Sequence, residues 1–265
     1  MAAQTSEVRL GFIGTGNIAS AVVEGFCTSG TPCQILLSPR NERKGLDLEA
    51  RFPQVRRATS NQAVLDRSQV VLLGLRPGVA PDILKDLRFS ADHTVLSFIP
   101  VIPHATLASL VLPARGVYKV LPLPYVARHL GLVPFFPPDA GVAERLRALG
   151  EPMPVREERE LHLLWAVTGL ISPFYALMEV IQSWCTAGGA DPATSKRYTA
   201  SMYASLASLA EGKTGMGFDD LAREAATPGG LNQMALGMIE EGTTFTDLRR
   251  ALDAILERFG EPPVA

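Results

Sequence analysis

The residues that most constrain the fold lie between Val8 and Ala19, where a short apolar run meets a glycine-containing turn. Such a run is typical of a buried parallel strand. It is followed by Gly14-x-Gly16-x-x-Ala19 and by a helical stretch, Ser20 to Phe26. In this arrangement the first glycine allows the tight turn, the second leaves room for a pyrophosphate, and the small third residue lets helix and strand pack closely. A structural glycine turn is the alternative, but the flanking strand and helix favour dinucleotide binding.

Length and charge narrow the class of protein. The 265 residues, 47% of them hydrophobic, suffice for one large or two medium domains with a sizeable core. The net charge of −2 and the isoelectric point near 6.1 suggest neither a nucleic acid nor an anionic membrane as partner. Cys27, Cys33 and Cys185 have no metal-ligand spacing, so we expect no metal site. An odd, scattered set of cysteines indicates reduced thiols and a cytoplasmic protein.

Two stretches of the sequence bear on a membrane location, one polar and one apolar. Met1 to Glu7 is short and polar, so we expect no signal segment before the first strand. The most apolar stretch, Leu161 to Ile181, carries His162 and Glu179 and is interrupted at Gly169 and Pro173. We therefore expect a pair of core helices there rather than a membrane span.

The end of the second expected strand, Gln34 to Leu37, predicts which dinucleotide binds. An NAD-binding unit of this type has an acidic residue there, which accepts hydrogen bonds from the ribose 2′-OH. Here Ser38-Pro39-Arg40-Asn41 stands in that place, followed by Arg43 and Lys44. A guanidinium binds a 2′-phosphate in a bidentate way, whereas a carboxylate repels it. This favours NADPH, with NADH as a possible second cofactor, unless Arg40 is merely a solvated loop residue.

Strands and helices alternate as far as residue 156. A helix is expected over Glu42–Arg51, and buried strands at Val70–Leu75 and His93–Ile99. Leu75, Arg76 and Pro77 end the first of these strands and are expected near the nicotinamide half of the cofactor, since carboxyl ends of strands line the ligand crevice. Leu132–Phe136 is expected as an edge strand, because Pro134 lacks a backbone donor. Further strands are expected at Tyr118–Pro124 and Pro152–Val155.

From residue 157 the pattern is helical almost to the end. The sequence therefore predicts a Rossmann-type, doubly wound α/β domain at 1–156 and an all-helical domain at 157–265. Candidate helices cover 156–167, 173–187, 192–212, 218–226, 230–241 and 246–259. Small residues are dense along Ala200–Ala210, which suits either an intersubunit face or an internal packing face.

Several motifs together resemble the pyrroline-5-carboxylate reductases. Gly11 to Ala19 is close to the opening of that family, and Ser38-Pro39-Arg40-Asn41 resembles its NADPH-selecting turn. Leu75-Arg76-Pro77 matches its V-K-P, and Thr227-Pro228-Gly229-Gly230 matches its S-P-G-G loop. The resemblance covers almost the whole chain. It implies a Rossmann domain, a helical domain at 157–265 for substrate binding and dimerisation, and active sites formed between subunits of an interlocked homodimer, with a larger oligomer left open.

The substrate-side motifs depart from that family. Its R-x-M-P-N-x-P corresponds to Lys119 to Tyr125, with Leu123 in place of the asparagine beside the nicotinamide. Its S-G-S-G-P-A-Y corresponds to Gly169 to Tyr175, without the glycine before proline. The paired threonines after P-G-G are Leu231 and Asn232; leucine has no donor for a carboxylate, whereas the asparagine amide has one. These departures favour an imine with a more apolar group.

The predicted function is NADPH-dependent reduction of a cyclic imine, 1-pyrroline-5-carboxylate to L-proline or a related imine, which implies a role in proline biosynthesis. The alternatives are a hydroxy-acid or carbonyl reductase of similar two-domain layout, and a non-catalytic NADPH-binding sensor. Reductases of that layout use a lysine in the helical domain, where Lys196 and Lys213 lie in no recognisable motif. Lys119 is either a structural cation at a strand end or a group facing the nicotinamide, and Ser172 and Thr227 are either substrate contacts or helix N-caps. The expected cofactor contacts are Gly14, Thr15, Gly16, Asn17, Ile18, Ser38, Arg40, Asn41, Leu75, Arg76 and Pro77. The expected substrate-side residues are Ser172, Tyr175, Thr227, Gly229, Gly230 and Asn232.

Overall fold

The computed structural model describes residues 7–264, which divide into two compact units. The first runs to Trp165 and also contains Arg258–Glu261; the second is Ala166–Glu257 together with the segment that follows Glu261. The boundary expected after residue 156 lies just before helix α7 (Glu158–Thr168), whereas the contacts divide the chain within that helix. The reason is that the first turns of α7 pack on the sheet, where Leu161 is fully buried.

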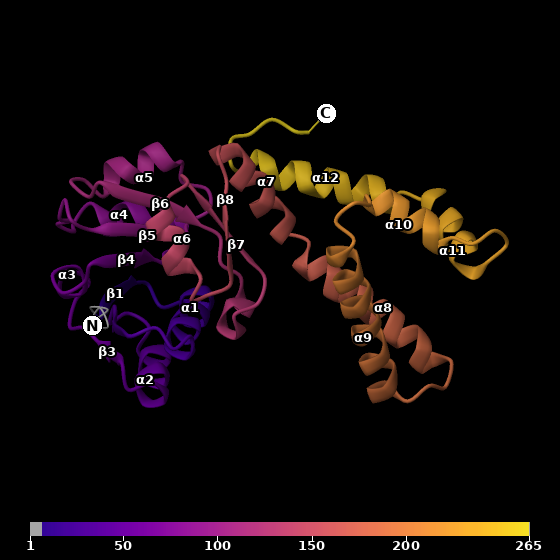
Figure 1. The fold of residues 1–265 in the computed structure, drawn as a ribbon, viewed down its shortest axis with the longest axis horizontal. Helices are drawn as coiled ribbons and strands as arrows, with labels where there is room; N and C mark the ends of the chain where they lie inside the picture. The colour runs from indigo at the N-terminus through magenta and orange to yellow at the C-terminus, as the bar shows by residue number, and fades with distance from the viewer. Residues whose placement is uncertain (1–6, 265) are drawn as a thin grey trace, which may run out of the picture. The chain divides into compact units, whose positions relative to one another are not determined.

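The first unit is built on one eight-stranded sheet (Figure 1). Its strands run in the order β3-β2-β1-β4-β5-β6-β7-β8, and every neighbouring pair is parallel except β6 with β7. The predicted doubly wound α/β fold is thereby confirmed. The strands are β1 (Val8–Ile13), β2 (Cys33–Leu37), β3 (Val55–Arg57), β4 (Val70–Leu73), β5 (Thr94–Ser97), β6 (Gly116–Val120), β7 (Leu132–Phe136) and β8 (Glu151–Pro154).

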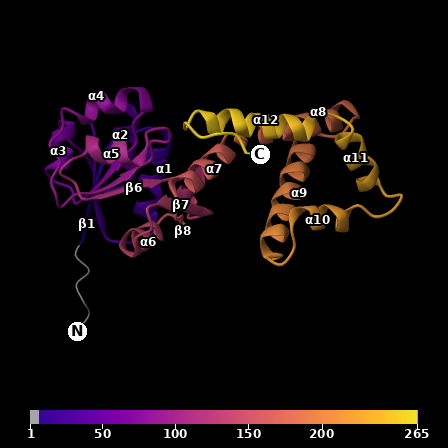
Figure 2. The ribbon, with the colours of Figure 1, turned by 90° about the horizontal axis from the view of Figure 1, so that it is seen from above.

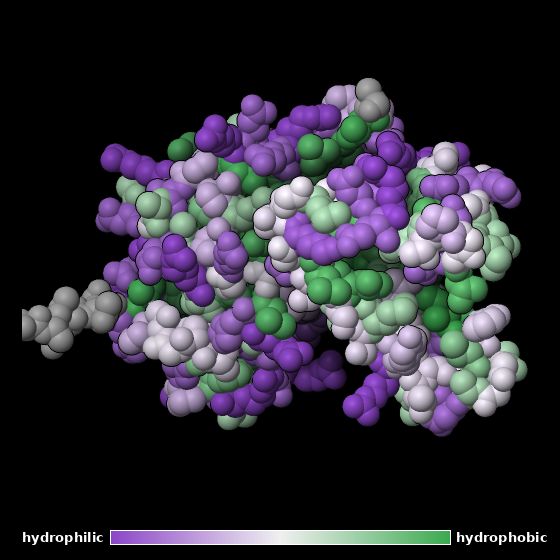
Figure 3. Space-filling view, turned by 45° about the vertical axis from the view of Figure 1, so that its right-hand side comes forward, coloured by the Kyte–Doolittle hydropathy of each residue, from purple (hydrophilic) through white to green (hydrophobic). Residues whose placement is uncertain are grey.

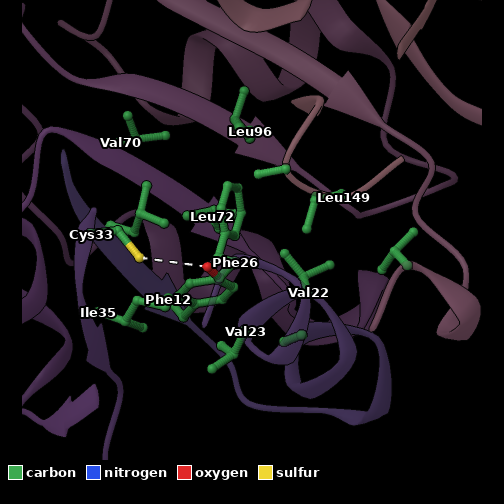
Figure 4. Packing of buried hydrophobic residues seen from close by; sticks show 14 of the residues in the cluster. Phe12, Val22, Val23, Phe26, Cys33, Ile35, Val70, Leu72, Leu96 and Leu149 are labelled. Carbon is green, nitrogen blue, oxygen red and sulfur yellow. Dashed lines mark hydrogen bonds between the residues drawn. The ribbon is translucent and has the colours of Figure 1, made fainter. Parts of the chain in front are cut away.

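Helices cover both faces of the sheet, because most of its strands are apolar on both sides. One core joins the sheet to α1, α2 and α6, and Figure 4 shows its centre, where Phe12 meets Val22 and Phe26. The other core joins the sheet to α3, α4 and α5. The helical elements of this unit are α1 (Asn17–Thr28), α2 (Glu42–Arg51), α3 (Asn61–Leu65), η1 (Pro77–Val79), α4 (Ala80–Leu84), α5 (His104–Leu110), η2 (Pro124–Arg128) and α6 (Ala140–Leu146).

Strand β7 is not the edge strand that Pro134 predicted. It pairs with β6 on one side and with β8 on the other, so β8 forms the edge. The β6–β7 pairing is short and antiparallel, and the carbonyl of Pro134 accepts a hydrogen bond from the Leu121 N–H at 2.9 Å. Proline lacks only the donor, so it is tolerated inside the sheet where its carbonyl makes the bond.

The second unit consists of helices that enclose almost no core (Figures 1 and 2). No residue of α8, α10 or α11 is buried, and α9 buries only Ser195 and Thr199. The expectation of a core helix pair at Leu161–Ile181 is therefore wrong for α8. The helices are α8 (Ile171–Ala187), α9 (Pro192–Gly212), α10 (Phe218–Ala225), α11 (Leu231–Glu240) and α12 (Thr244–Glu257).

Large apolar side chains lie open on this helical unit, and hydrophobic residues reach the surface in Figure 3. Trp184 is 78% exposed and Tyr198 71%. Within residues 7–264, the stretch Glu158–Ala187 is the one helical segment whose length and composition suffice to cross a membrane. Helices that other protein covers share this length and composition, so these two features alone do not indicate a membrane span.

Candidate functional site

The glycine turn lies where the strand order of the sheet reverses. Strands β1 and β4 are neighbours, and their chain connections run to opposite sides, so their carboxyl ends frame the crevice in which such sheets bind ligands. Gly14 has φ +94°, and a Cβ placed there would lie 2.7 Å from the carbonyl oxygen of Gly74. Only glycine permits both this backbone conformation and this close approach of the two strand ends.

The start of α1 has the features of a cradle for a pyrophosphate. Gly16 is the N-cap of the helix, and a Cβ built on it would meet no atom within 4 Å, so the space in front of it is open. Thr15 is 4% exposed, yet its hydroxyl Oγ1 has no hydrogen-bond partner among the described residues. A buried hydroxyl beside free helix N–H groups suits a phosphate oxygen as its missing partner. Asn17 and Ile18 open the helix, and no acidic residue lies in its first turn.

The segment after β2 folds back on the glycine turn. The buried hydroxyl of Ser38 accepts a hydrogen bond from the Gly14 N–H at 2.8 Å, and the amide of Asn41 donates to the carbonyl of Thr15 at 2.7 Å. Lys44, on α2, donates to the side chain of Asn17. Ser38 and Asn41 therefore hold the turn through hydrogen bonds to its backbone. The contact of Lys44 with Asn17 was not predicted from the sequence.

Arg40 stands apart from these contacts. Its side chain is exposed, and no hydrogen bond or ion pair with another residue of the described chain engages its guanidinium. The three residues expected near the nicotinamide half lie beyond β4: Leu75 packs against the second core and against Gly14, Arg76 caps η1, and Pro77 is its first residue. The structure thus brings all the expected cofactor residues to one edge of the sheet.

Lys119, near the end of β6, is fully buried and has no surface to offer a ligand. Its ammonium lies 2.8 Å from Glu158 Oε1, 2.9 Å from the Pro100 carbonyl and 3.1 Å from His162 Nε2. Burial lowers the pKa of Lys119, against the opposing effect of Glu158. Burial alone raises the pKa of Glu158, but Lys119, the His104 N–H and His162 together outweigh it, so that pKa is lowered. Of the two roles open from the sequence, the geometry supports the structural one.

The partners of Lys119 were missed by the sequence reasoning. Glu158 and His162 are four residues apart on α7 and lie 3.3 Å apart, a spacing that was visible in the sequence. Glu261, whose Oε1 lies 3.0 Å from His162 Nδ1, is 99 residues away from it and left no local signal.

On α8, Ser172 and Tyr175 are exposed in the second unit. Ser172 is not an N-cap, because Leu170 occupies that position. Tyr175 is 65% exposed and its ring lies 5.6 Å from that of Phe174. Its hydroxyl is free of hydrogen bonds to other residues within 7–264.

The P-G-G loop precedes α11. Gly229 has φ +72°, Gly230 is the N-cap of α11, and the N–H of Gly230 donates to the carbonyl of Thr227 at 2.9 Å. Asn232 already donates its amide to the carbonyl of Ala225 at 3.1 Å. Thr227 is thus a turn residue and not the N-cap. No hydrogen bond between described residues joins this loop to Ser172 or Tyr175, since α8 packs mainly on α9 and α11 on α12.

Comparisons with known proteins agree with this architecture. The family described as "NADP oxidoreductase coenzyme F420-dependent" matches residues 9–100. A pyrroline-5-carboxylate reductase of Vibrio alginolyticus is 25% identical over 96% of this chain and 97% of its own. The crystal structure of 1-pyrroline-5-carboxylate reductase from Streptococcus pyogenes superposes with a TM-score of 0.81 at 20% identity, over 96% of this chain and 99% of that one. The Plasmodium falciparum pyrroline carboxylate reductase with NADP bound gives 0.81 at 15% identity, over 96% and 97%.

Proposed function

We propose that this chain, which is similar to pyrroline-5-carboxylate reductases over almost its whole length, is an NADPH-dependent oxidoreductase that reduces the C=N bond of a cyclic imine. The observation that carries the proposal is the open cradle at Gly16, with the unpartnered hydroxyl of Thr15 beside it and the free guanidinium of Arg40 at the end of β2. These groups match a pyrophosphate and a 2′-phosphate.

The residues present divide the work of binding. The first N–H groups of α1 and the hydroxyl of Thr15 hold the pyrophosphate, and Arg40 holds the 2′-phosphate, with NADH as a weaker alternative that lacks this contact. Leu75, Arg76 and Pro77 line the nicotinamide half. NADPH supplies the hydride that reduces the imine carbon. Because a protonated imine already accepts hydride readily, the protein needs chiefly to orient the two reactants and exclude water.

For the substrate we propose 1-pyrroline-5-carboxylate, giving L-proline, or a related cyclic imine. Ser172, Tyr175, Thr227, Gly229, Gly230 and Asn232 are the proposed substrate-side residues. The free N–H groups at the start of α11 suit a carboxylate. Leu231, which is 82% exposed beside them, adds apolar surface and no donor, so an imine with an apolar substituent is also included. Proline biosynthesis is the proposed role if 1-pyrroline-5-carboxylate is the substrate.

We also propose a homodimer formed through the C-terminal helices, with which a larger oligomer is compatible. Its support is the set of large apolar side chains that the second unit leaves open, because soluble monomers rarely expose a continuous apolar surface of this kind. Within one chain no hydrogen bond joins Tyr175 to the P-G-G loop among residues 7–264, which agrees with sites completed by a second chain. A cytoplasmic location is proposed from the three free thiols.

The test is NADPH oxidation with a panel of five- and six-membered cyclic imines, each with and without a carboxylate. Turnover of 1-pyrroline-5-carboxylate to proline assigns the substrate directly. Turnover of another imine alone keeps the reaction and changes the substrate. Tight NADPH binding with no oxidation across the panel overturns the reductase proposal. Arg40→Ser serves as the matched control, because it weakens the use of NADPH without touching the imine site.

A further inference from the structure

One buried group has no part in the function proposed so far. Lys119 is the one lysine, arginine or carboxylate that is fully buried among residues 7–264. It lies at the centre of a set that we name the Lys119 cluster: Lys119, Glu158, His162, Glu261 and Arg159. All its members belong to the first unit. Removing a charge from water is costly, so such a group is expected only where every hydrogen-bonding position is filled.

The hydrogen bonds of the cluster form one consistent chain. The ammonium of Lys119 has three N–H groups and three acceptors within reach: the Pro100 carbonyl, Glu158 Oε1 and His162 Nε2. In the tautomer whose Nε2 accepts from Lys119, the Nδ1–H of His162 donates to Glu261 Oε1 at 3.0 Å. Arg159 donates to the other oxygen of Glu261 at 2.6 Å. The indole of Trp165, 5.3 Å from the ammonium, faces it as well.

What the cluster holds is the segment 98–104 that follows β5. Lys119 binds the carbonyl of Pro100, and Glu158 Oε1 accepts the backbone N–H of His104 at 2.8 Å. In register, Lys119 lies opposite Ser97, the last residue of β5. The ammonium therefore reaches beyond the end of β5, on the side of the switch point where β4, β5 and β6 end. In a doubly wound sheet this side receives the second half of the dinucleotide.

The other members of the cluster come from the two places where the chain passes between the units. Glu158 and His162 lie on α7, which leads out of the first unit, and Glu261 lies in Arg258–Glu261, where the chain is again part of the first unit. Lys119 itself belongs to β6. Its hydrogen bonds thus link this strand to the segment after β5 and, through His162, to both places where the chain passes between the units.

We propose that Lys119 is a positioning residue for the nicotinamide: it fixes the segment 98–104 against α7, so that the crevice holds the nicotinamide ring in one orientation. This inference rests on the proposed function. The dinucleotide is anchored mainly by contacts at β1 and β2, so loss of Lys119 leaves affinity for NADPH largely intact. Orientation of the ring suffers instead, and hydride transfer is sensitive to displacements of about 1 Å.

The decisive comparison is between a variant that removes only Lys119 from its ion pair with Glu158 and a variant that replaces both residues. Lys119→Met leaves Glu158 without its counter-ion and lowers both stability and orientation. The double variant Lys119→Met with Glu158→Met removes both charges, which usually restores stability, but it does not restore the bonds to Pro100 and His104. Glu158→Gln keeps an acceptor for both donors and is expected to lie between these variants and the wild type.

The measurements are the melting temperature, the Kd for NADPH, the anisotropy of bound nicotinamide fluorescence, and kcat. For both Met variants we expect kcat to fall about tenfold or more and the anisotropy to drop, with Kd changed less than about threefold. Leu146→Ala, which truncates a buried side chain at the end of α6, is the control for lost stability. Lys85→Met, which breaks the exposed ion pair with Asp82, is the control for lost charge. Neither control is expected to lower the anisotropy.

The proposal is overturned if the folded double variant keeps wild-type anisotropy and kcat, or if Kd rises in proportion to the loss of kcat. It is also overturned if Leu146→Ala, at equal loss of stability, lowers kcat and anisotropy as much. When the wild-type protein oxidises NADPH with none of the imines, the reductase function fails, and the anisotropy of bound NADPH alone still decides the role of Lys119.

Discussion

At the scale of single residues, two glycines of one turn have different reasons to be glycine. Gly14 is required by the fold, because its φ of +94° and the nearby Gly74 carbonyl both exclude a side chain. Gly16 has φ −83° and ψ −171°, which any residue adopts, and open space in front of it. The space at Gly16 is therefore not used by the protein itself, which leaves it for a ligand.

This difference gives a paired prediction. Gly14→Ala should destabilise the protein by about 2 kcal/mol or more, since strain and a close contact add. Gly16→Ala should change the free energy of unfolding by less than about 1 kcal/mol, the scale of a helix-cap effect, while weakening NADPH binding about tenfold or more. Chemical denaturation and cofactor titration of both variants measure this. Equal NADPH affinity in Gly16→Ala and the wild type contradicts the proposed cradle.

Arg40 carries the prediction for cofactor choice. Its exposed guanidinium makes no contact with other described residues, so Arg40→Ser should leave the melting temperature unchanged. Loss of a bidentate contact to a 2′-phosphate should lower kcat/KM for NADPH by about tenfold or more and leave the value for NADH within about twofold. Arg147→Ser, which removes an exposed arginine at the C-cap of α6 that within residues 7–264 pairs only with exposed Glu144, is the matched control. Equal losses of kcat/KM with NADPH and with NADH would show that Arg40 does not bind the 2′-phosphate.

At the scale of elements, helix ends are defined by single side chains. Asp139 caps α6: its Oδ1 accepts the Val142 N–H at 2.8 Å, and its Oδ2 accepts the Tyr118 hydroxyl at 3.0 Å. The Val142 N–H, with a smaller effect of Tyr118, lowers the pKa of the Asp139 carboxyl from its ordinary value. The cap therefore also ties α6 to the neighbouring strand β6.

Asp139→Ala should cost about 1 kcal/mol of stability at neutral pH, the usual effect of losing an N-cap. Because the folded-state pKa lies below the unfolded value of about 3.9, the charged cap stabilises fully above that value and less as pH falls through the folded pKa. Thermal unfolding of both proteins at neutral and at acidic pH measures the difference, which should shrink in acid. A difference that grows in acid contradicts the role of the carboxylate.

Most elements of the fold could be predicted from the sequence, because they depend on local patterns. The range expected for α2 matches the structure, and Asp191-Pro192 marks the start of α9, where Asp191 caps the helix. The position of β7 could not, since Pro134 reports which donor is missing and not which neighbours the strand has. Glu261 was missed because its partner His162 is remote in sequence. The residues proposed for the cofactor follow β1, β2 and β4, whereas those proposed for the substrate lie on α8 and at the start of α11.

At the scale of the whole molecule, the sequence suggested that apolar helices make a core, and the structure leaves α8 open. The hydrophobicity of a helix face indicates that other protein covers it, but it does not indicate whether that protein is the same chain or a second one. Trp184→Glu, on α8, should raise the dissociation constant of the proposed dimer about 100-fold or more, because a buried unpaired charge is costly. Sedimentation analysis measures this. Leu112→Glu, at a leucine of the first unit that is 69% exposed, should leave association unchanged. A dimer that tolerates Trp184→Glu contradicts the assignment of this face.

The Lys119 cluster also has a consequence in time. During synthesis Lys119, Glu158 and His162 emerge in that order, but Glu261 is added 99 residues after His162. Until Glu261 has been translated, the His162 imidazole lacks its acceptor and the chain has not yet returned to the first unit. The nascent nucleotide-binding domain can build its sheet early, yet it closes its last buried polar contact only after the entire helical unit has been translated.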